Sequence, residues 1–162
     1  MSELKTRYDD DFVAWSKEQA EALRAEARAG SNQKLDWENL AEEVESLGRS
    51  QLHELKSQVR RVIEHLLKLE YSLASDPRSG WIESIGDARS EIELVLEDSP
   101  SLEREIDAAI TTGLKHGARK AIFALEEYGE LAPVVAARIR ATTYTPDQVL
   151  GDWLPPKRWP QA

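Results

Sequence analysis

The stretch DWENLAEEVESLGRSQLHELKSQVRRVIEHLLKLEYSL, residues 36–73, decides the fold. Apolar residues recur along it at intervals of three and four, the spacing that gathers side chains on one face of an α-helix. Asp36 stands just before the pattern and is a good N-cap. The stretch predicts either one helix of roughly 35 residues, with a kink at Gly48, or two helices that join there.

The sequence before this stretch predicts another helix. Phe12, Trp15 and Leu23 recur at helical spacing, and the acidic residues 9–11 suit the cap and the positive start of a helix. Gly30 ends the pattern. We therefore expect a helix between the acidic run and Gly30.

The sequence after residue 73 predicts two long helices and two short ones. A turn cluster at residues 75–80 precedes a helix that begins near Trp81. Ser99-Pro100 is a cap followed by a proline at the first helical position, and it predicts the start of the next long helix. Pro133 and the pair Thr145-Pro146 mark the two short helices.

The expected fold class is therefore all-α. We predict a helical bundle of four main helices, the second unusually long, plus two short C-terminal helices. Residues 1–154 are expected to form a single helical domain, and residues 155–162 an irregular C-terminal tail with Trp159 in it. The expected core includes Leu40, Val44, Leu47, Trp81 and Ile106.

Two glycines inside the fourth long helix predict close packing. Gly113 and Gly117 lie one turn apart on its apolar side. Each costs about 1 kcal/mol of helix propensity relative to alanine. We expect another helix to pack closely against them.

Composition excludes several classes of protein. The chain has 162 residues, 30 Asp and Glu against 21 Lys and Arg, and no cysteine, which excludes disulfides, thiolate metal sites and cysteine nucleophiles. The net charge of −9 argues against binding to nucleic acid or to an anionic membrane. No apolar leader or spanning segment is visible, so we expect a soluble, acidic, cytoplasmic protein.

Catalytic motifs are missing from the sequence. No Gly-x-Ser-x-Gly elbow and no glycine-rich phosphate loop occurs. Neighbouring acids such as Glu42 and Glu43 point about 100° apart on a helix and cannot act on one bond. We expect no catalytic residues and no cofactor, which favours a protein that is not an enzyme.

A metal site is the alternative that the histidines leave open. No Glu-x-x-His pair of the di-iron type occurs, and the candidate ligands are Glu43, His65 and His116. Glu43 and His65 stand about 33 Å apart along a straight helix, so they share an ion only if the chain reverses at Gly48. Other helices would then supply partners such as Glu105 or Glu126. The simpler interpretation is a boundary histidine that is hydrogen-bonded to a carboxylate or carbonyl.

Charges segregate along the outward face of the long helix. We name its first part the acidic strip (Glu38, Glu42, Glu45) and its second part the basic strip (Arg49, His53, Lys56, Arg60). Ion pairs within the helix, Glu45 with Arg49 and Glu64 with Lys68, would each contribute about 0.2–0.5 kcal/mol. The alternative is an interaction face, because two antiparallel copies would set acid against base twice, as a two-fold dimer requires.

Several segments together resemble domain-of-unknown-function family 29. The most specific is LDWENLAEEVESLGR, residues 35–49, and the resemblance extends over residues 8–154. It includes Tyr8, Asp11, Trp15, His65, Tyr71, Trp81, residues 96–102, Tyr144, Gln148 and Leu150. The resemblance implies an all-helical, soluble, bacterial protein of a family abundant in cyanobacteria, and it implies no activity.

The sequence therefore favours a non-enzymatic protein-interaction or regulatory module that self-associates. The expected partner is a protein, with a homodimer as one form. The alternative is an enzyme or sensor with a histidine–carboxylate metal site between helices.

Overall fold

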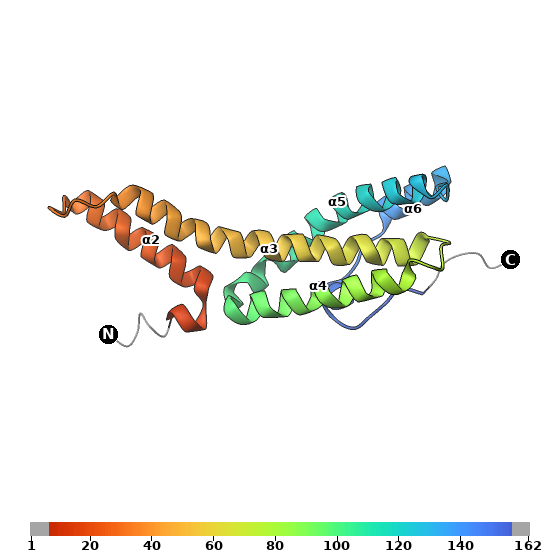
Figure 1. Cartoon of the computed structure of the whole chain (residues 1–162), viewed down its shortest axis with the longest axis horizontal. Coiled ribbons are helices and arrows are strands. Elements are labelled where there is room, and N and C mark those ends of the chain that lie inside the picture. The colour runs from red at the N-terminus through yellow and green to blue at the C-terminus, as the bar shows by residue number, and fades with distance from the viewer. Residues whose placement is uncertain (1–6, 157–162) are drawn as a thin grey trace. The chain divides into compact units, whose positions relative to one another are not determined.

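The computed structural model of the chain describes residues 7–156, which form helices and connecting segments without a strand. The long helices are α2 (Phe12–Ala29), α3 (Trp37–Tyr71), α4 (Arg78–Asp98) and α5 (Ile106–Glu127) (Figure 1). A 3₁₀ helix, η1 (Pro100–Glu105), precedes α5, and α6 (Pro133–Ala141) and α7 (Pro146–Leu150) follow it. The predicted all-α class, with four main helices and two short C-terminal ones, is confirmed.

These elements group into two compact units. The first unit comprises residues 1–54 and 94–104, and the second comprises residues 55–93 and 105–162. Helix α3 is continuous over 35 residues, so it contributes its first half to one unit and its second half to the other. The expectation of a single domain over residues 1–154 stays a prediction.

The predicted helix boundaries are mostly confirmed by local chemistry. Gly30 ends α2 with a φ of 72°, a left-handed conformation that costs glycine little. Pro133 occupies the first turn of α6. Thr145 caps α7 in a capping box, in which its side chain accepts from the Gln148 N–H and the Gln148 side chain accepts from the Thr145 N–H.

Ser99 departs from its predicted role. Its Oγ accepts a hydrogen bond from the Val13 N–H in the first turn of α2, at 3.3 Å, instead of capping the helix that follows it. The Leu102 N–H donates to the Ser99 carbonyl, and residues 100–105 wind as a 3₁₀ helix. The α-helix therefore begins at Ile106, later than the Ser99-Pro100 pair predicts.

Asp11 ties the start of α2 to η1. One carboxylate oxygen accepts from the Ala14 N–H at 2.8 Å and so caps α2, as predicted for the acidic run. The other accepts from the Ser101 N–H at 2.6 Å. One side chain thus satisfies donors from two segments that are 90 residues apart in the sequence.

In the first unit, α2 packs against the side of α3 that carries small residues. A Cβ on Gly48 would collide with the Ser16 side chain of α2, and Ala41, two turns earlier, is fully buried. The helix runs through Gly48 without interruption, so this glycine serves a close approach rather than a break.

This packing corrects the expected core. Leu40 and Leu47 are 41% and 50% exposed, and Val44 is half-buried, whereas Trp81 and Ile106 are buried as expected. The reason is geometric: α2 covers the Ala41–Gly48 side of α3, and each leucine points about 100° away from its small neighbour.

In the second unit, α5 packs on the second half of α3 through its glycines, as predicted. A Cβ on Gly113 would lie 2.9 Å from Ile63 Cδ1, and one on Gly117 would lie 3.1 Å from Ile63 Cγ2 and 3.3 Å from the Glu64 backbone nitrogen. Ile63 is fully buried at this crossing. The face of α5 opposite the glycines is therefore turned away from α3.

The C-terminal segment is held to the second unit by polar contacts. The Tyr144 hydroxyl donates to the buried Glu70 carboxylate at 2.6 Å. The Arg89 guanidinium donates to the carbonyls of Gln148, Val149 and Trp153. Trp153 is half-buried beside Tyr144, and Trp159 and most of the predicted tail lie outside the described residues.

The two glycines should respond differently to alanine. At Gly113 the close atom is the far end of the Ile63 side chain, which can move, so Gly113→Ala should leave the free energy of unfolding unchanged or raise it by up to about 1 kcal/mol. At Gly117 the new methyl group meets the α3 backbone, so Gly117→Ala should lower it by about 1 kcal/mol. Urea denaturation of both variants measures this difference, and equal effects would contradict the packing.

Candidate functional site

Two members of the acidic strip of α3, Glu42 and Glu45, form ion pairs within the chain. Arg24 of α2 donates to Glu45 at 2.6 Å and lies 3.6 Å from Glu42. Arg49 pairs with Glu42. It also lies 3.8 Å from Glu45, four residues earlier on the helix, which is the predicted intrahelical pair. The hydrogen bond from Arg24 holds the pKa of Glu45 below its ordinary value of 4.5. The intrahelical interpretation of these charges is therefore confirmed at Glu45 and Arg49.

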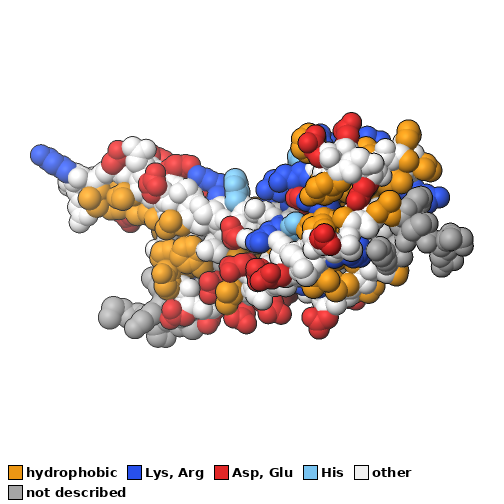
Figure 2. All heavy atoms as spheres, turned by 45° about the vertical axis from the view of Figure 1, so that its right-hand side comes forward, with side chains coloured by type: hydrophobic (Ala, Val, Ile, Leu, Met, Phe, Trp, Pro, Cys, Tyr) orange, Lys and Arg blue, Asp and Glu red, His pale blue; other side chains and the backbone are white. Residues whose placement is uncertain are grey.

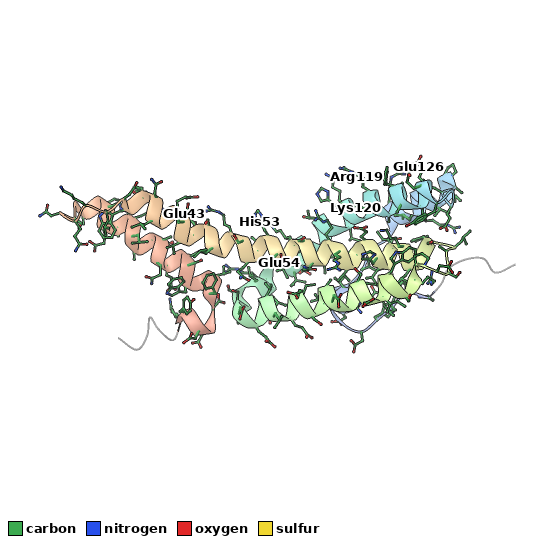
Figure 3. The ribbon with its side chains drawn as sticks, in the orientation of Figure 1. Glu43, His53, Glu54, Arg119, Lys120 and Glu126 are labelled. Atoms are coloured by element: carbon green, nitrogen blue, oxygen red, sulfur yellow. The ribbon has the colours of Figure 1, made fainter. Side chains whose placement is uncertain are left out.

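The remainder of the basic strip has no ion pair among residues 7–156. His53 and Lys56 are exposed, and Arg60 is half-buried near Gly113. Figure 3 shows His53 projecting from α3, and Glu43 on the same helix. Glu38, at the start of the acidic strip, is also exposed. The proposed antiparallel pairing of these strips stays a prediction.

The candidate metal ligands do not form a metal site within residues 7–156. No group of three His, Asp or Glu side chains there lies close enough to hold an ion. Glu43 belongs to the first unit, and His65 and His116 to the second. Because α3 does not reverse at Gly48, the condition that would bring Glu43 to His65 is not met.

His65 lies in a half-buried, positively charged environment. Burial lowers its pKa below 6.5, and the charges of Lys68, Arg61 and Lys120 lower it further, while Glu64 acts in the opposite direction. Its Nδ1 is buried and has no hydrogen-bond partner among the described residues. The neutral imidazole is therefore the form that the folded chain favours at neutral pH.

Glu64 links α3 to α5 beside this histidine. It accepts from Lys68 at 2.7 Å, the second predicted intrahelical pair, and lies 3.6 Å from Lys120 of α5. Burial alone would raise the pKa of Glu64, but the hydrogen bond from Lys68 and the charges of Lys68 and Lys120 lower it below 4.5.

An uncovered apolar surface lies on the first unit. We name Leu40, Val44 and Leu47 the apolar row, and Tyr8, Phe12 and Trp15 the aromatic cluster, whose ring centroids lie 4.8–5.8 Å apart. Gln51, one turn after Leu47, lines the same shallow hollow as Tyr8 and Phe12. Figure 2 shows hydrophobic side chains gathered over α2 and the first half of α3, with acidic side chains beside them.

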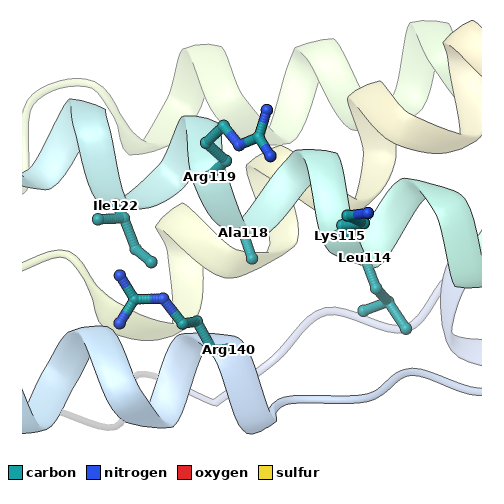
Figure 4. Close-up of a pocket in the computed structure, with 6 residues that line it drawn as sticks. All are labelled: Leu114, Lys115, Ala118, Arg119, Ile122 and Arg140. Atoms are coloured by element: carbon teal, nitrogen blue, oxygen red, sulfur yellow. The ribbon is translucent and has the colours of Figure 1, made fainter.

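A second hollow lies between α5 and α6. This cavity of about 490 Å³, which we name the cationic cavity, is lined by Leu114, Lys115, Ala118, Arg119, Ile122 and Arg140. Lys115 and Arg119 project from α5, and Arg140 reaches from α6 toward Ile122 (Figure 4). Within the part of the chain that the structure describes, no carboxylate lines it.

Sequence reasoning missed both hollows. The leucines of the apolar row were assigned to the core, because their spacing does not show which side of α3 its neighbour covers. The cationic cavity had a signal: residues 108–125 contain three basic residues and no acidic one. Arg140 could not be added to it without the arrangement of α5 and α6.

Glu64 should make stability depend on pH. Because its folded pKa is lowered, its contribution is fully present above the unfolded value of about 4.5 and is lost as the pH falls through the folded pKa. Glu64→Gln should therefore lower the free energy of unfolding by about 1 kcal/mol at pH 7, and the difference from the unaltered chain should shrink as the pH falls below about 4.5. Urea denaturation at pH 3.5–7 measures this, with the exposed Glu126→Gln as control. A difference at pH 3.5 as large as the one at pH 7 would contradict the assignment.

Comparison with known proteins places the chain in a family. None of the helices in the described part combines the length and the hydropathy needed to cross a membrane. The crystal structure, at 1.45 Å resolution, of an α-helical protein of unknown function from Rhodospirillum rubrum is similar, with a TM-score of 0.71 and 26% identity over 90% of this chain and 89% of that one. A search of curated proteins gave no match. The family model described as "Domain of unknown function DUF29" matches residues 7–154, and the chain belongs to this family.

Proposed function

We propose that this protein is a non-enzymatic protein-interaction module that binds its partner through the apolar row and the aromatic cluster. The observation that supports this is the exposure of Leu40 and Leu47, 41% and 50%, in a row that α2 leaves uncovered. Apolar side chains at positions i, i+4 and i+7 of a helix are a common means of docking a partner helix. A bacterial, cytoplasmic setting is part of the proposal, and the bacterial part is supported by the similar protein from Rhodospirillum rubrum.

The charges around the apolar row indicate a basic partner. Asp9 and Asp98 line the hollow beside the aromatic cluster, and Glu43 is exposed next to Val44. By sequence, the first unit carries 16 acidic and eight basic side chains, a net charge of −8, whereas the second carries 14 and 13, a net charge of −1. A basic amphipathic helix would match both the apolar row and its acidic surroundings.

A model peptide tests this surface. An 18-residue helical peptide of leucine and lysine should bind, and a leucine–glutamate peptide of the same pattern should not. Leu47→Glu should weaken binding of the leucine–lysine peptide at least tenfold, because a charge then enters the apolar contact. The same substitution at Val134, an exposed residue of the second unit, should leave binding unchanged. Isothermal titration calorimetry measures all four combinations.

The Leu47 variant separates apolar docking from simple charge attraction. Leu47→Glu makes the first unit more acidic, so purely electrostatic binding of the basic peptide would become tighter. Tighter binding, or no binding to the unaltered chain, would overturn the proposal. Circular dichroism of each variant checks that the helices remain folded.

A second copy of the chain is the competing partner that the sequence predicts. If the acidic and basic strips hold a homodimer, Arg49→Glu combined with Lys56→Glu should weaken the dimer, as measured by native mass spectrometry and sedimentation equilibrium. An unchanged association constant would contradict that arrangement. If Leu47→Glu instead dissociates a dimer, the apolar row binds a second copy of the chain. That result would overturn the proposal that its partner is a basic helix.

A further inference from the structure

The cationic cavity has the size and lining of a small-molecule site. Its volume of about 490 Å³ falls within the roughly 300–1,000 Å³ typical of ligand pockets. Leu114, Ala118 and Ile122 supply apolar surface, and three cationic side chains stand among them. Such a lining suits a ligand with an anionic group and an apolar body.

The three cations of the cavity have no hydrogen-bond or ion-pair partner among the described residues. Lys115, Arg119 and Arg140 form neither hydrogen bonds nor ion pairs with residues 7–156. Some other basic side chains of the second unit are engaged, Lys68 and Lys120 with Glu64 and Arg89 with three carbonyls. Lys56 and Arg60 on α3 also lack an ion pair with the described residues, but neither of them lines this cavity. Three unneutralised positive charges around one hollow leave an anion as their missing counter-charge.

The surrounding sequence keeps carboxylates away from the cavity. Residues 108–125 of α5 contain no Asp or Glu, and neither does α6. In a chain with a net charge of −9, both helices that line the cavity therefore present only positive charge to it over these residues. The local charge is therefore positive in a chain whose net charge is negative, and a positive local charge is what an anionic ligand requires.

The fold holds the cavity residues on an outward face. Gly113 and Gly117 fix one side of α5 against α3, so Lys115, Arg119 and Ile122 project from other sides of the helix. Arg140 lies in the last turn of α6 and completes the cavity from a second helix. The cations thus come from rigid elements rather than from loops, which favours a defined site.

We infer that the cationic cavity binds a phosphate-bearing small molecule of nucleotide size. Guanidinium groups match phosphate oxygens by paired hydrogen bonds, and two arginines with one lysine balance the charge of a diphosphate. The apolar lining would contact the organic part of the ligand. This inference is independent of the proposed docking surface, which lies in the other unit.

Calorimetric titration of the full chain with inorganic pyrophosphate and with adenosine diphosphate tests the inference. Both should bind with one-to-one stoichiometry, and adenosine diphosphate should bind at least tenfold more tightly because it adds contacts with the apolar lining. Arg119→Gln and Arg140→Gln should each weaken binding at least tenfold. Arg138→Gln is the matched control, since Arg138 lies on the same helix and does not line the cavity.

Three results would overturn the inference. They are the absence of saturable binding of either probe at millimolar concentration, equal losses from Arg138→Gln and Arg140→Gln, and displacement of adenosine diphosphate by a short single-stranded oligonucleotide at lower concentration. The last would assign the cations to nucleic acid. A fourth result, equal affinity for pyrophosphate and adenosine diphosphate, would show that the apolar lining takes no part and would overturn the nucleotide size of the ligand.

Discussion

The close approach of α5 to α3 at Gly113 and Gly117 is the constraint on which the second unit depends. A side chain at Gly117 would press on the Glu64 backbone, whereas one at Gly113 would displace only the end of the Ile63 side chain, so the near approach of the two backbones depends most on Gly117. That contact sets the rotation of α5 about its own axis. The rotation in turn decides which residues face the core and which line the cavity beside α6.

Charge is distributed unevenly between the two units, and this shapes what each can bind. The first unit is strongly acidic, yet Arg24 and Arg49 neutralise the part of α3 where its acids are densest. What stays open there is apolar surface with acids around it. The second unit is nearly neutral overall, and three of its positive charges line one cavity. The two hollows therefore differ in chemistry as well as in place.

Local chemistry made much of the fold predictable. Gly30, Pro133 and the Thr145 capping box act through their own backbone or through residues within three positions, so the sequence alone identifies them. The pairing of Gly113 and Gly117 with another helix was predictable for a related reason: glycine inside a helix is costly unless close packing requires it.

The remaining features depend on partners distant in the sequence. The sequence predicts that Ser99 caps the helix that follows it, but its Oγ instead accepts a hydrogen bond from the Val13 N–H, 86 residues away. The exposure of Leu40 and Leu47 follows from which side of α3 receives α2, and periodicity shows a stripe without showing what covers it. The cationic cavity was therefore less predictable than the fold, because Arg140 and Arg119 line the same cavity only as a result of the packing of α6 on α5.

The contact between Asp11 and Ser101 also has a consequence for synthesis of the chain. Residues 94–104 belong to the same unit as the first 54 residues, and the cap of α2 uses donors and acceptors from residues 99 and 101. During translation α2 therefore emerges long before the residues that complete its cap. The first unit closes only after residue 104 has left the ribosome, so long-range loop closure rather than helix formation sets the earliest moment at which it can fold.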